Sequence, residues 1–143
     1  MRPRIVLDTN TVLALWMFHD PRLRTLRDWI DTDACTLCAR ADALSELQLV
    51  LAYRQFGLDT LTQQSLLHDY RARVEIFDAA ASSGERPLPP CRDADDQKFL
   101  ELAFDADASS LLTRDKALLR LARHRLLRER FAIVTPEQFV SQL

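Results

Sequence analysis

Four acidic residues lie at junctions between apolar runs and helical segments of this 143-residue chain. Asp8 and Asp115 each follow a short apolar run, whereas Glu46 and Asp96 each lie in the early turns of a helical pattern. Carboxylates that converge without a compensating lysine repel one another, and a hard divalent cation with oxygen ligands relieves that repulsion. If the fold brings these four residues together, they predict a Mg²⁺ or Mn²⁺ site that can activate water for attack on a phosphodiester.

Each of these acids also has an ordinary structural interpretation. Asp115 fits the N-cap of the helix that follows it, and Asp96 fits a first helical turn, where the macrodipole favours an acid. Glu46 is harder to assign to the surface, because it shares a helical face with Ala43 and Val50 and an unpaired buried charge is costly. The placement of the elements that carry these residues decides between the two interpretations.

Short apolar runs alternate with helical patterns along the chain. Strands are expected at 4–7, 35–39, 74–77, 109–113 and 132–135. Helices are expected at 9–19, 20–30, 41–57, 60–73, 94–107, 115–127 and 136–143. The stretch 79–90, rich in small residues and proline, is linker-like.

This alternation predicts an α/β fold in a single domain over residues 1–143. We expect a central, mostly parallel five-stranded sheet with helices on both faces, because crossovers between parallel strands are right-handed. The carboxyl ends of parallel strands share one edge of the sheet, and ligands bind along that edge. All four acids map to it, so they are expected to converge.

Composition narrows the class of protein. Apolar residues make up 48% of the chain, too many for a disordered protein, and no run approaches the ~20 apolar residues of a membrane span. The first residues lack a signal-peptide pattern, so a cytoplasmic protein without a membrane segment is expected. Three cysteines predict no disulfide framework, and the CTLC motif has no second pair to complete a zinc site. If CTLC is a strand, Cys35 and Cys38 point to opposite faces.

Arginine carries most of the positive charge. The net charge of −2 excludes a global basic field, but 17 of the 19 basic residues are arginine, and several gather between 114 and 130. This segment is either a solvated helix face or a rim that contacts nucleic-acid phosphates. The candidates for phosphate contact are Arg114, Arg120, Arg123, Arg125 and Arg128.

The apolar run LWMF contains Trp16, Met17 and Phe18 and is the candidate surface for a homodimer or a partner protein. Core packing is the competing interpretation, since large apolar side chains are mostly buried.

Four short motifs, VLDTN, SEL, RDADDQKFLELA and LLTRDKALL, occur in this order along the chain. Together they resemble a PIN domain, in the branch that contains toxin components of bacterial toxin–antitoxin pairs. The resemblance implies an endoribonuclease that cleaves single-stranded RNA with Mg²⁺ or Mn²⁺, and an antitoxin protein as its partner. It assigns catalysis and metal binding to Asp8, Glu46, Asp96 and Asp115, and supporting roles to Asn10, Thr113 and Asp93.

Arg114 departs from this resemblance, because many relatives of the branch carry glycine at that position. The difference leaves the expected fold intact. It bears on how Asp115 is oriented, and it adds a candidate phosphate contact.

Two other functions remain open from the sequence. One is a PIN-fold module that binds RNA or a partner protein without cleaving RNA. The other is a phospho-acceptor receiver domain, which is also an α/β sheet with acids at its carboxyl edge. A receiver domain needs a lysine at the end of its last strand, and AIVTPEQ contains none.

Overall fold

The computed structural model describes residues 2–77 and 87–143, so most of the linker-like stretch 79–90 lies outside the described residues. Five strands form one sheet in the order β3-β2-β1-β4-β5, and every neighbouring pair is parallel. The strands are β1 (Arg4–Leu7), β2 (Thr36–Arg40), β3 (Val74–Phe77), β4 (Ser110–Leu112) and β5 (Ala132–Val134). The predicted α/β fold is confirmed, with a wholly parallel sheet.

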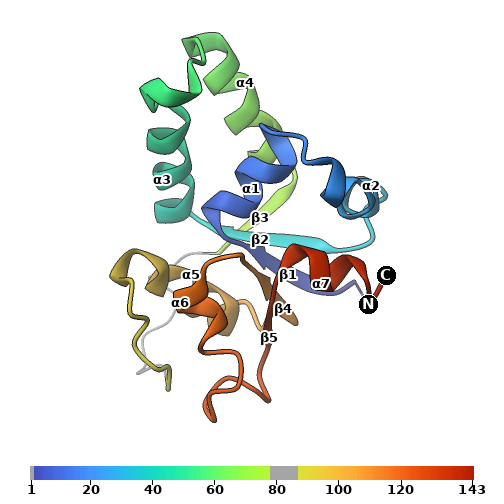
Figure 1. Ribbon diagram of the computed structural model, residues 1–143, viewed down its shortest axis with the longest axis vertical. Coiled ribbons are helices and arrows are strands. Elements are labelled where there is room, and N and C mark those ends of the chain that lie inside the picture. Colours follow the sequence, from blue (N-terminus) through green and yellow to red (C-terminus); the bar gives the residue numbers. More distant parts are fainter. Residues whose placement is uncertain (1, 78–86) are drawn as a thin grey trace.

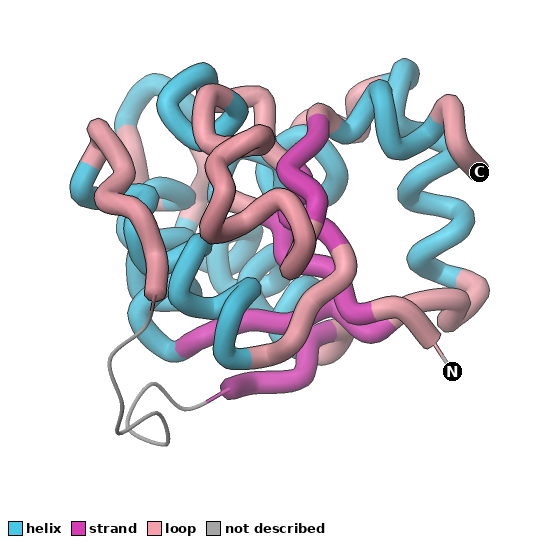
Figure 2. The backbone as a smooth tube through the Cα atoms, turned by 90° about the horizontal axis from the view of Figure 1, so that it is seen from below, coloured by secondary structure: helices cyan, strands magenta, loops and turns pink. Residues whose placement is uncertain are grey.

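Helices cover both faces of the sheet, which crosses the middle of the molecule (Figures 1 and 2). The α-helices are α1 (Thr9–Trp16), α2 (Arg24–Asp31), α3 (Ala41–Leu51), α4 (Thr60–Arg71), α5 (Gln97–Asp105), α6 (Lys116–Leu119) and α7 (Pro136–Val140). Short 3₁₀ helices are η1 (Pro21–Leu23), η2 (Arg54–Phe56) and η4 (Ala94–Asp96). Among the described residues, no helix combines the length and the apolar character needed to cross a membrane.

Alternation along the central strand β1 builds two separate cores. Ile5 and Leu7 pack with α1, α2, α3 and α4 on one face, whereas Val6 packs with α5 and α6 on the other. Strands buried on both faces read as continuous apolar runs, and this explains the sequence of β1. Around β2 the same alternation places Cys35 in the first core and Cys38 in the second. The expectation that these two cysteines face opposite sides of the sheet is confirmed.

Several helices end earlier than the apolar pattern predicts. Helix α1 ends at Trp16 because His19 adopts a left-handed conformation and the Asp20 N–H donates back to the Ala14 carbonyl. Helix α3 ends at Leu51, and the chain turns through η2 to Gly57, whose φ of 60° suits glycine.

Helix α6 is only one turn long, although a helix to residue 127 was predicted (Figure 1). The ring nitrogen Nδ1 of His124 accepts the backbone N–H of Leu126, so that N–H does not bond to a helical carbonyl. Leu118 and Leu127 are nevertheless both buried in the second core, because the irregular turns still return the chain to the sheet.

The strand order explains where a ligand site can form. From β1 the chain moves outward through β2 to β3, and it then returns to place β4 on the other side of β1. Connections therefore leave β1 and β4 in opposite directions, and their carboxyl ends flank a crevice. In open α/β sheets such a reversal of strand order marks the ligand site. Asp8 follows β1 and Asp115 lies just beyond β4, so two of the predicted acids border this crevice.

Candidate metal centre

A cleft of about 260 Å³ opens at the carboxyl edge of the sheet. Side chains from separate parts of the chain line it, and all four predicted acids are among them. The polar lining residues are Asp8, Thr9, Asn10, Glu46, Gln55, Asp96 and Asp115, and the others are Leu13, Val50, Tyr53, Phe56 and Phe99. None of these lining residues is a lysine or an arginine. The predicted convergence of the four carboxylates on one cleft is thus what the structure shows.

Asp8 is buried and serves two neighbours at once. One carboxylate oxygen accepts the N–H of Thr11 at 2.9 Å, which caps the start of α1, and the other accepts the hydroxyl of Thr113. Burial raises the pKa of Asp8, against the lowering effect of these hydrogen bonds. Asp8 is therefore both a helix cap and part of the cleft lining. The structural interpretation and the site interpretation of this residue are compatible.

Thr113 connects the ends of the two central strands. Its fully buried hydroxyl donates to Asp8 and accepts the backbone N–H of Asp115 at 2.9 Å. The side chain of Asp115 then accepts the N–H of Ala117 at 2.7 Å and caps α6. Thr113 therefore fixes the backbone of Asp115 relative to the side chain of Asp8.

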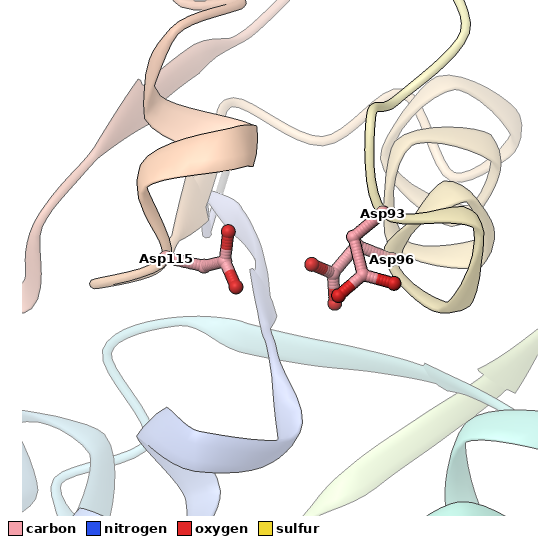
Figure 3. A group of neighbouring side chains, drawn as sticks. All are labelled: Asp93, Asp96 and Asp115. Atoms are coloured by element: carbon pink, nitrogen blue, oxygen red, sulfur yellow. The ribbon is translucent and has the colours of Figure 1, made fainter.

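Three carboxylates form the tightest acidic group among the described residues. One oxygen each of Asp93, Asp96 and Asp115 lies within 4.8 Å of the others, and Figure 3 shows Asp115 facing the other two. Asp93 also caps η4 by accepting the N–H of Asp95, as a cap preceding Asp96 should. The resemblance implied a supporting role for Asp93, but its oxygen also lies within 4.8 Å of those of Asp96 and Asp115.

Asp96 lies in the most unfavourable environment of the three. Its Oδ2 atom is buried and has no hydrogen-bond partner among the described residues. Burial, followed by the negative charges of Asp115, Asp93 and Asp8, raises the pKa of Asp96 to about 7. Near neutral pH this carboxyl group therefore lacks the compensation that a cation would supply.

Glu46 has a partner that the sequence argument did not anticipate. The ammonium of Lys98 lies 2.7 Å from Oε2 of Glu46, and the two side chains are 15% and 31% exposed. The angles are not those of a hydrogen bond, so Oε2 of Glu46 has no hydrogen-bond partner among the described residues. The expectation that the acids converge without a compensating lysine is wrong for Glu46. A lysine two positions after Asp96 was the signal available in the sequence.

Arg114 points into an ion-pair network outside the cleft lining. Its Nε atom donates to Glu137 at 3.0 Å, and its NH2 group lies 2.9 Å from Asp20. Asp20 also pairs with Arg22, and these bonds lower the pKa of Asp20 below its usual range. A phosphate that contacts Arg114 would therefore compete with the carboxylates of Glu137 and Asp20. Asp115 still caps α6, although Arg114 stands where many relatives of the branch carry glycine.

The other predicted residues divide into two groups. Asn10 is exposed and lines the cleft, as a polar supporting residue should. The remaining arginines are exposed and do not line it: Arg120, Arg123, Arg125 and Arg128. They lie after the short α6, within the irregular segment that leads to β5.

A family model described as a PIN domain matches residues 4–117, which is most of the chain. The chain belongs to the PIN-domain family. The matched range of this PIN domain contains all four predicted acids, together with Asn10 and Thr113. It ends before Arg120 and the arginines that follow. No curated protein matches the chain. Membership of this family, a nuclease-type fold, removes the phospho-acceptor receiver domain from consideration.

The acidic group of this PIN domain fits a divalent metal ion. Its donors are all carboxylate oxygens, the ligands that hard divalent cations prefer. The buried oxygen of Asp96 without a partner is the observation that calls for a cation, because an uncompensated buried carboxylate is costly. Asp93, Asp96 and Asp115 are the residues placed to hold such an ion, while Asp8 lies beside them with both oxygens engaged.

The apolar wall of the cleft was not predicted. Tyr53 and Phe56 lie beyond the end of α3, in a stretch that the helical pattern included in the helix. The glycine at position 57 signalled the end of an element, but nothing in the sequence indicated that the turn before it would border the acids. In the LWMF run, Trp16 is buried against Tyr70, whereas Phe18 is exposed.

Proposed function

We propose that this PIN domain is a metal-dependent endoribonuclease that cleaves single-stranded RNA with Mg²⁺ or Mn²⁺. The observation that carries the proposal is the cleft at the carboxyl edge, where acids from four separate segments meet and a buried oxygen of Asp96 has no partner. A divalent ion held there supplies Lewis-acid stabilisation of phosphodiester oxygens and a water of lowered pKa. Mg²⁺ and Mn²⁺ suit an all-carboxylate ligand set better than metals that favour sulfur or imidazole.

In this proposal the residues of the cleft have different tasks. Asp93, Asp96 and Asp115 bind the ion, and Asp8 and Thr113 hold the backbone of Asp115 in place. Glu46, partly neutralised by Lys98, faces the same space and can orient a water molecule or bind a second ion. Asn10, exposed at the cleft, is available to donate a hydrogen bond to a phosphate oxygen.

Cleavage of a labelled single-stranded RNA by the purified protein tests the proposal. We expect cleavage that requires Mg²⁺ or Mn²⁺, stops in EDTA, and is lost in Asp96→Asn and Asp115→Asn. Asp59→Asn is the matched control, because Asp59, like Asp115, caps a helix by accepting a backbone N–H, and it does not line the cleft. Cleavage that persists in EDTA, or in both cleft variants, would overturn the proposal.

One observation supports a second function, an RNA- or protein-binding module that does not cleave RNA. Both oxygens of Asp8 are engaged, Glu46 is paired with Lys98 and Asp115 caps α6, so three of the four acids already have protein partners. The same assay distinguishes the two functions. RNA that binds and is released intact in the presence of Mn²⁺ favours the binding module.

We also propose that the protein is the toxin of a toxin–antitoxin pair acting in the cytoplasm. The resemblance of the four motifs to that branch supports this role, and exposed Phe18 is a candidate contact for a second copy or an antitoxin. Production of the protein in cells should arrest growth, whereas production of Asp96→Asn should not. Co-production of the product of a neighbouring gene should relieve the arrest. Normal growth with well-folded parent protein would contradict this role.

A further inference from the structure

One wall of the acidic cleft is aromatic and open to solvent. Tyr53 and Phe56 line the cleft, and their rings are nearly parallel, with an interplanar angle of 16° and centroids 6.2 Å apart. Phe18 meets Phe56 edge-on at 5.8 Å. Tyr53 is 50% exposed and Phe18 is 61% exposed, whereas Phe56 packs against the first core. Phe56 thus anchors the cluster to the core, and the rings of Tyr53 and Phe18 are exposed to solvent beside the cleft.

The turn that carries this wall is well defined. The N–H of Tyr53 donates to Val50 at 3.0 Å, and the N–H of Phe56 donates to Tyr53 at 3.1 Å. Gly57 then closes the turn with a left-handed backbone, which an ordinary side chain would strain. The backbone of Tyr53 is therefore fixed by hydrogen bonds, and its ring lies beside that of Phe56, which is packed against the core.

The charge of the cleft limits what can bind beside the acids. Its lining contains four carboxylates and no lysine or arginine, so without a metal ion it repels the phosphates of RNA. Attraction that does not depend on charge must come from the apolar wall. Bases of single strands stack on aromatic side chains, and this contact tolerates any base because every base has a flat π-face. Bases inside a duplex are stacked on one another, so only an unpaired base can use such a wall.

We propose that Tyr53, supported by Phe56, is the stacking platform for an unpaired base of the RNA strand whose phosphate lies at the acidic group. This inference rests on the proposed function, because it assumes that RNA enters the cleft. It makes Tyr53 a substrate-positioning residue and gives a physical basis for a preference for single strands. Arg54 and Gln55 are exposed in the same turn, and Gln55 also lines the cleft, so polar groups flank the stacked base.

Binding of a short fluorescent single-stranded RNA, followed by anisotropy in Ca²⁺, tests the platform while a cation with oxygen ligands offsets the charge of the acids. A gel of each sample confirms that the RNA is still intact. Tyr53→Ala and Tyr53→Leu should raise Kd about 5- to 100-fold, the range expected for one lost base–aromatic stack. Tyr53→Phe and Tyr53→Trp should bind like the parent protein. Leu61→Ala is the matched control, because Leu61 is 77% exposed and lies outside the cleft lining. Thermal melts of each variant confirm that it is folded.

Two further comparisons identify the interaction as stacking. A strand with the same phosphates but without bases should bind the parent protein and Tyr53→Ala equally well. The slope of log Kd against log salt should be the same for both proteins, since no phosphate contact is lost. Equal binding of the base-containing RNA to the parent protein, Tyr53→Ala and Tyr53→Leu would overturn the inference. The inference would also be overturned if Tyr53→Ala altered the oligomeric state of the protein but not its affinity for RNA. That result would assign the aromatic wall to contact between protein molecules.

The cleavage assay separates this inference from the proposed function. In Mn²⁺, Tyr53→Ala should raise KM more than it lowers kcat, whereas Asp96→Asn abolishes turnover. If the parent protein cleaves RNA and Tyr53→Ala leaves both Kd and KM unchanged, the platform is wrong and the nuclease proposal stands. If the parent protein does not cleave RNA but Tyr53→Ala still weakens binding, the platform stands and the nuclease proposal fails.

Discussion

The ammonium of Lys98 lies 2.7 Å from a carboxylate oxygen of Glu46, so one acid of the cleft has a positive neighbour within the protein. Because of this pair, the acids of the cleft differ in how well their negative charge is compensated. Glu46 has a cation in the protein, whereas Asp96 has a buried oxygen with no partner among the described residues. A metal ion is therefore expected to depend most on Asp93, Asp96 and Asp115, and Lys98 should oppose its entry.

Replacement of Lys98 tests this balance. Lys98→Gln should destabilise the metal-free protein by about 1–2 kcal/mol, because it leaves Glu46 without its partner. The same variant should bind Mn²⁺ about three- to tenfold more tightly, since a positive charge near the ion is removed. Titration calorimetry and metal-free urea melts measure the two effects. Arg24→Gln removes one positive charge away from the cleft and should change neither, and an unchanged Mn²⁺ affinity in Lys98→Gln would contradict the prediction.

The pKa of Asp96 predicts a pH effect on stability without metal. Its folded value of about 7 lies above the ordinary 3.8, so the folded protein binds more protons than the unfolded chain between these values. Stability should therefore fall as pH rises from about 4 to about 7. Asp96→Asn should reduce this fall, to which buried Asp8 also contributes through its raised pKa, and should gain about 1–2 kcal/mol at pH 8, allowing for solvent screening. Urea melts in EDTA across this range measure it, and a parallel decline in the variant would exclude Asp96 as the cause.

Asp8 can be compared directly with another aspartate cap. Asp8 and Asp59 begin α1 and α4 with nearly identical backbone angles, and each accepts a backbone N–H three residues ahead. Asp8→Ala and Asp59→Ala should each lose about 1 kcal/mol from the cap, and Asp8→Ala should lose up to ~2 kcal/mol more because buried Thr113 loses its acceptor. Only Asp8→Ala should lose the stabilisation by Mn²⁺ and RNA cleavage. Equal activity of the two folded variants would reduce Asp8 to a structural cap.

Arginines beyond the family match have a separate test. Replacing Arg123, Arg125 and Arg128 with glutamine should weaken binding of every RNA sequence alike. It should also reduce the slope of log K against log salt by up to about 2, if all three contact phosphates. Arg114→Gln is the contrasting variant, because its guanidinium pairs with Glu137 and Asp20. It should lose about 0.5–1 kcal/mol of stability and keep the slope. An unchanged slope in the triple variant would leave these arginines as a solvated surface.

The sequence predicted what depends on strand alternation and chain order. Buried runs such as residues 5–7 are visible as β-branched and leucine-rich segments, and a parallel sheet then sends Asp8 and Asp115 to the same edge. Features that depend on side-chain direction could not be read in this way. The pairing of Lys98 with Glu46 requires α5 and α3 to face each other across the cleft.

The spacing of apolar residues also could not predict where local hydrogen bonds end a helix. The helical periodicity continues past Leu51 and past Leu119, yet both helices stop there. In the second case His124 accepts a backbone N–H that a helix would use, and no periodicity of apolar residues reports such a contact. The early end of α3 matters more for function, because it frees Tyr53 to border the acids.

The hydroxyl of Thr113 bonds to a carboxylate 105 positions earlier in the chain, and this separation sets when the acidic group can exist. As the protein emerges from the ribosome, β1, β2 and β3 can pair while Asp96 and Asp115 are still unmade. The three close carboxylates are incomplete until β4 has docked on β1 and the chain has passed residue 115. A polypeptide interrupted between residues 47 and 114 carries Asp8 and Glu46 but lacks Asp115, so its acidic group is incomplete. The order of the strands thus couples assembly of the acidic group to the synthesis and docking of β4.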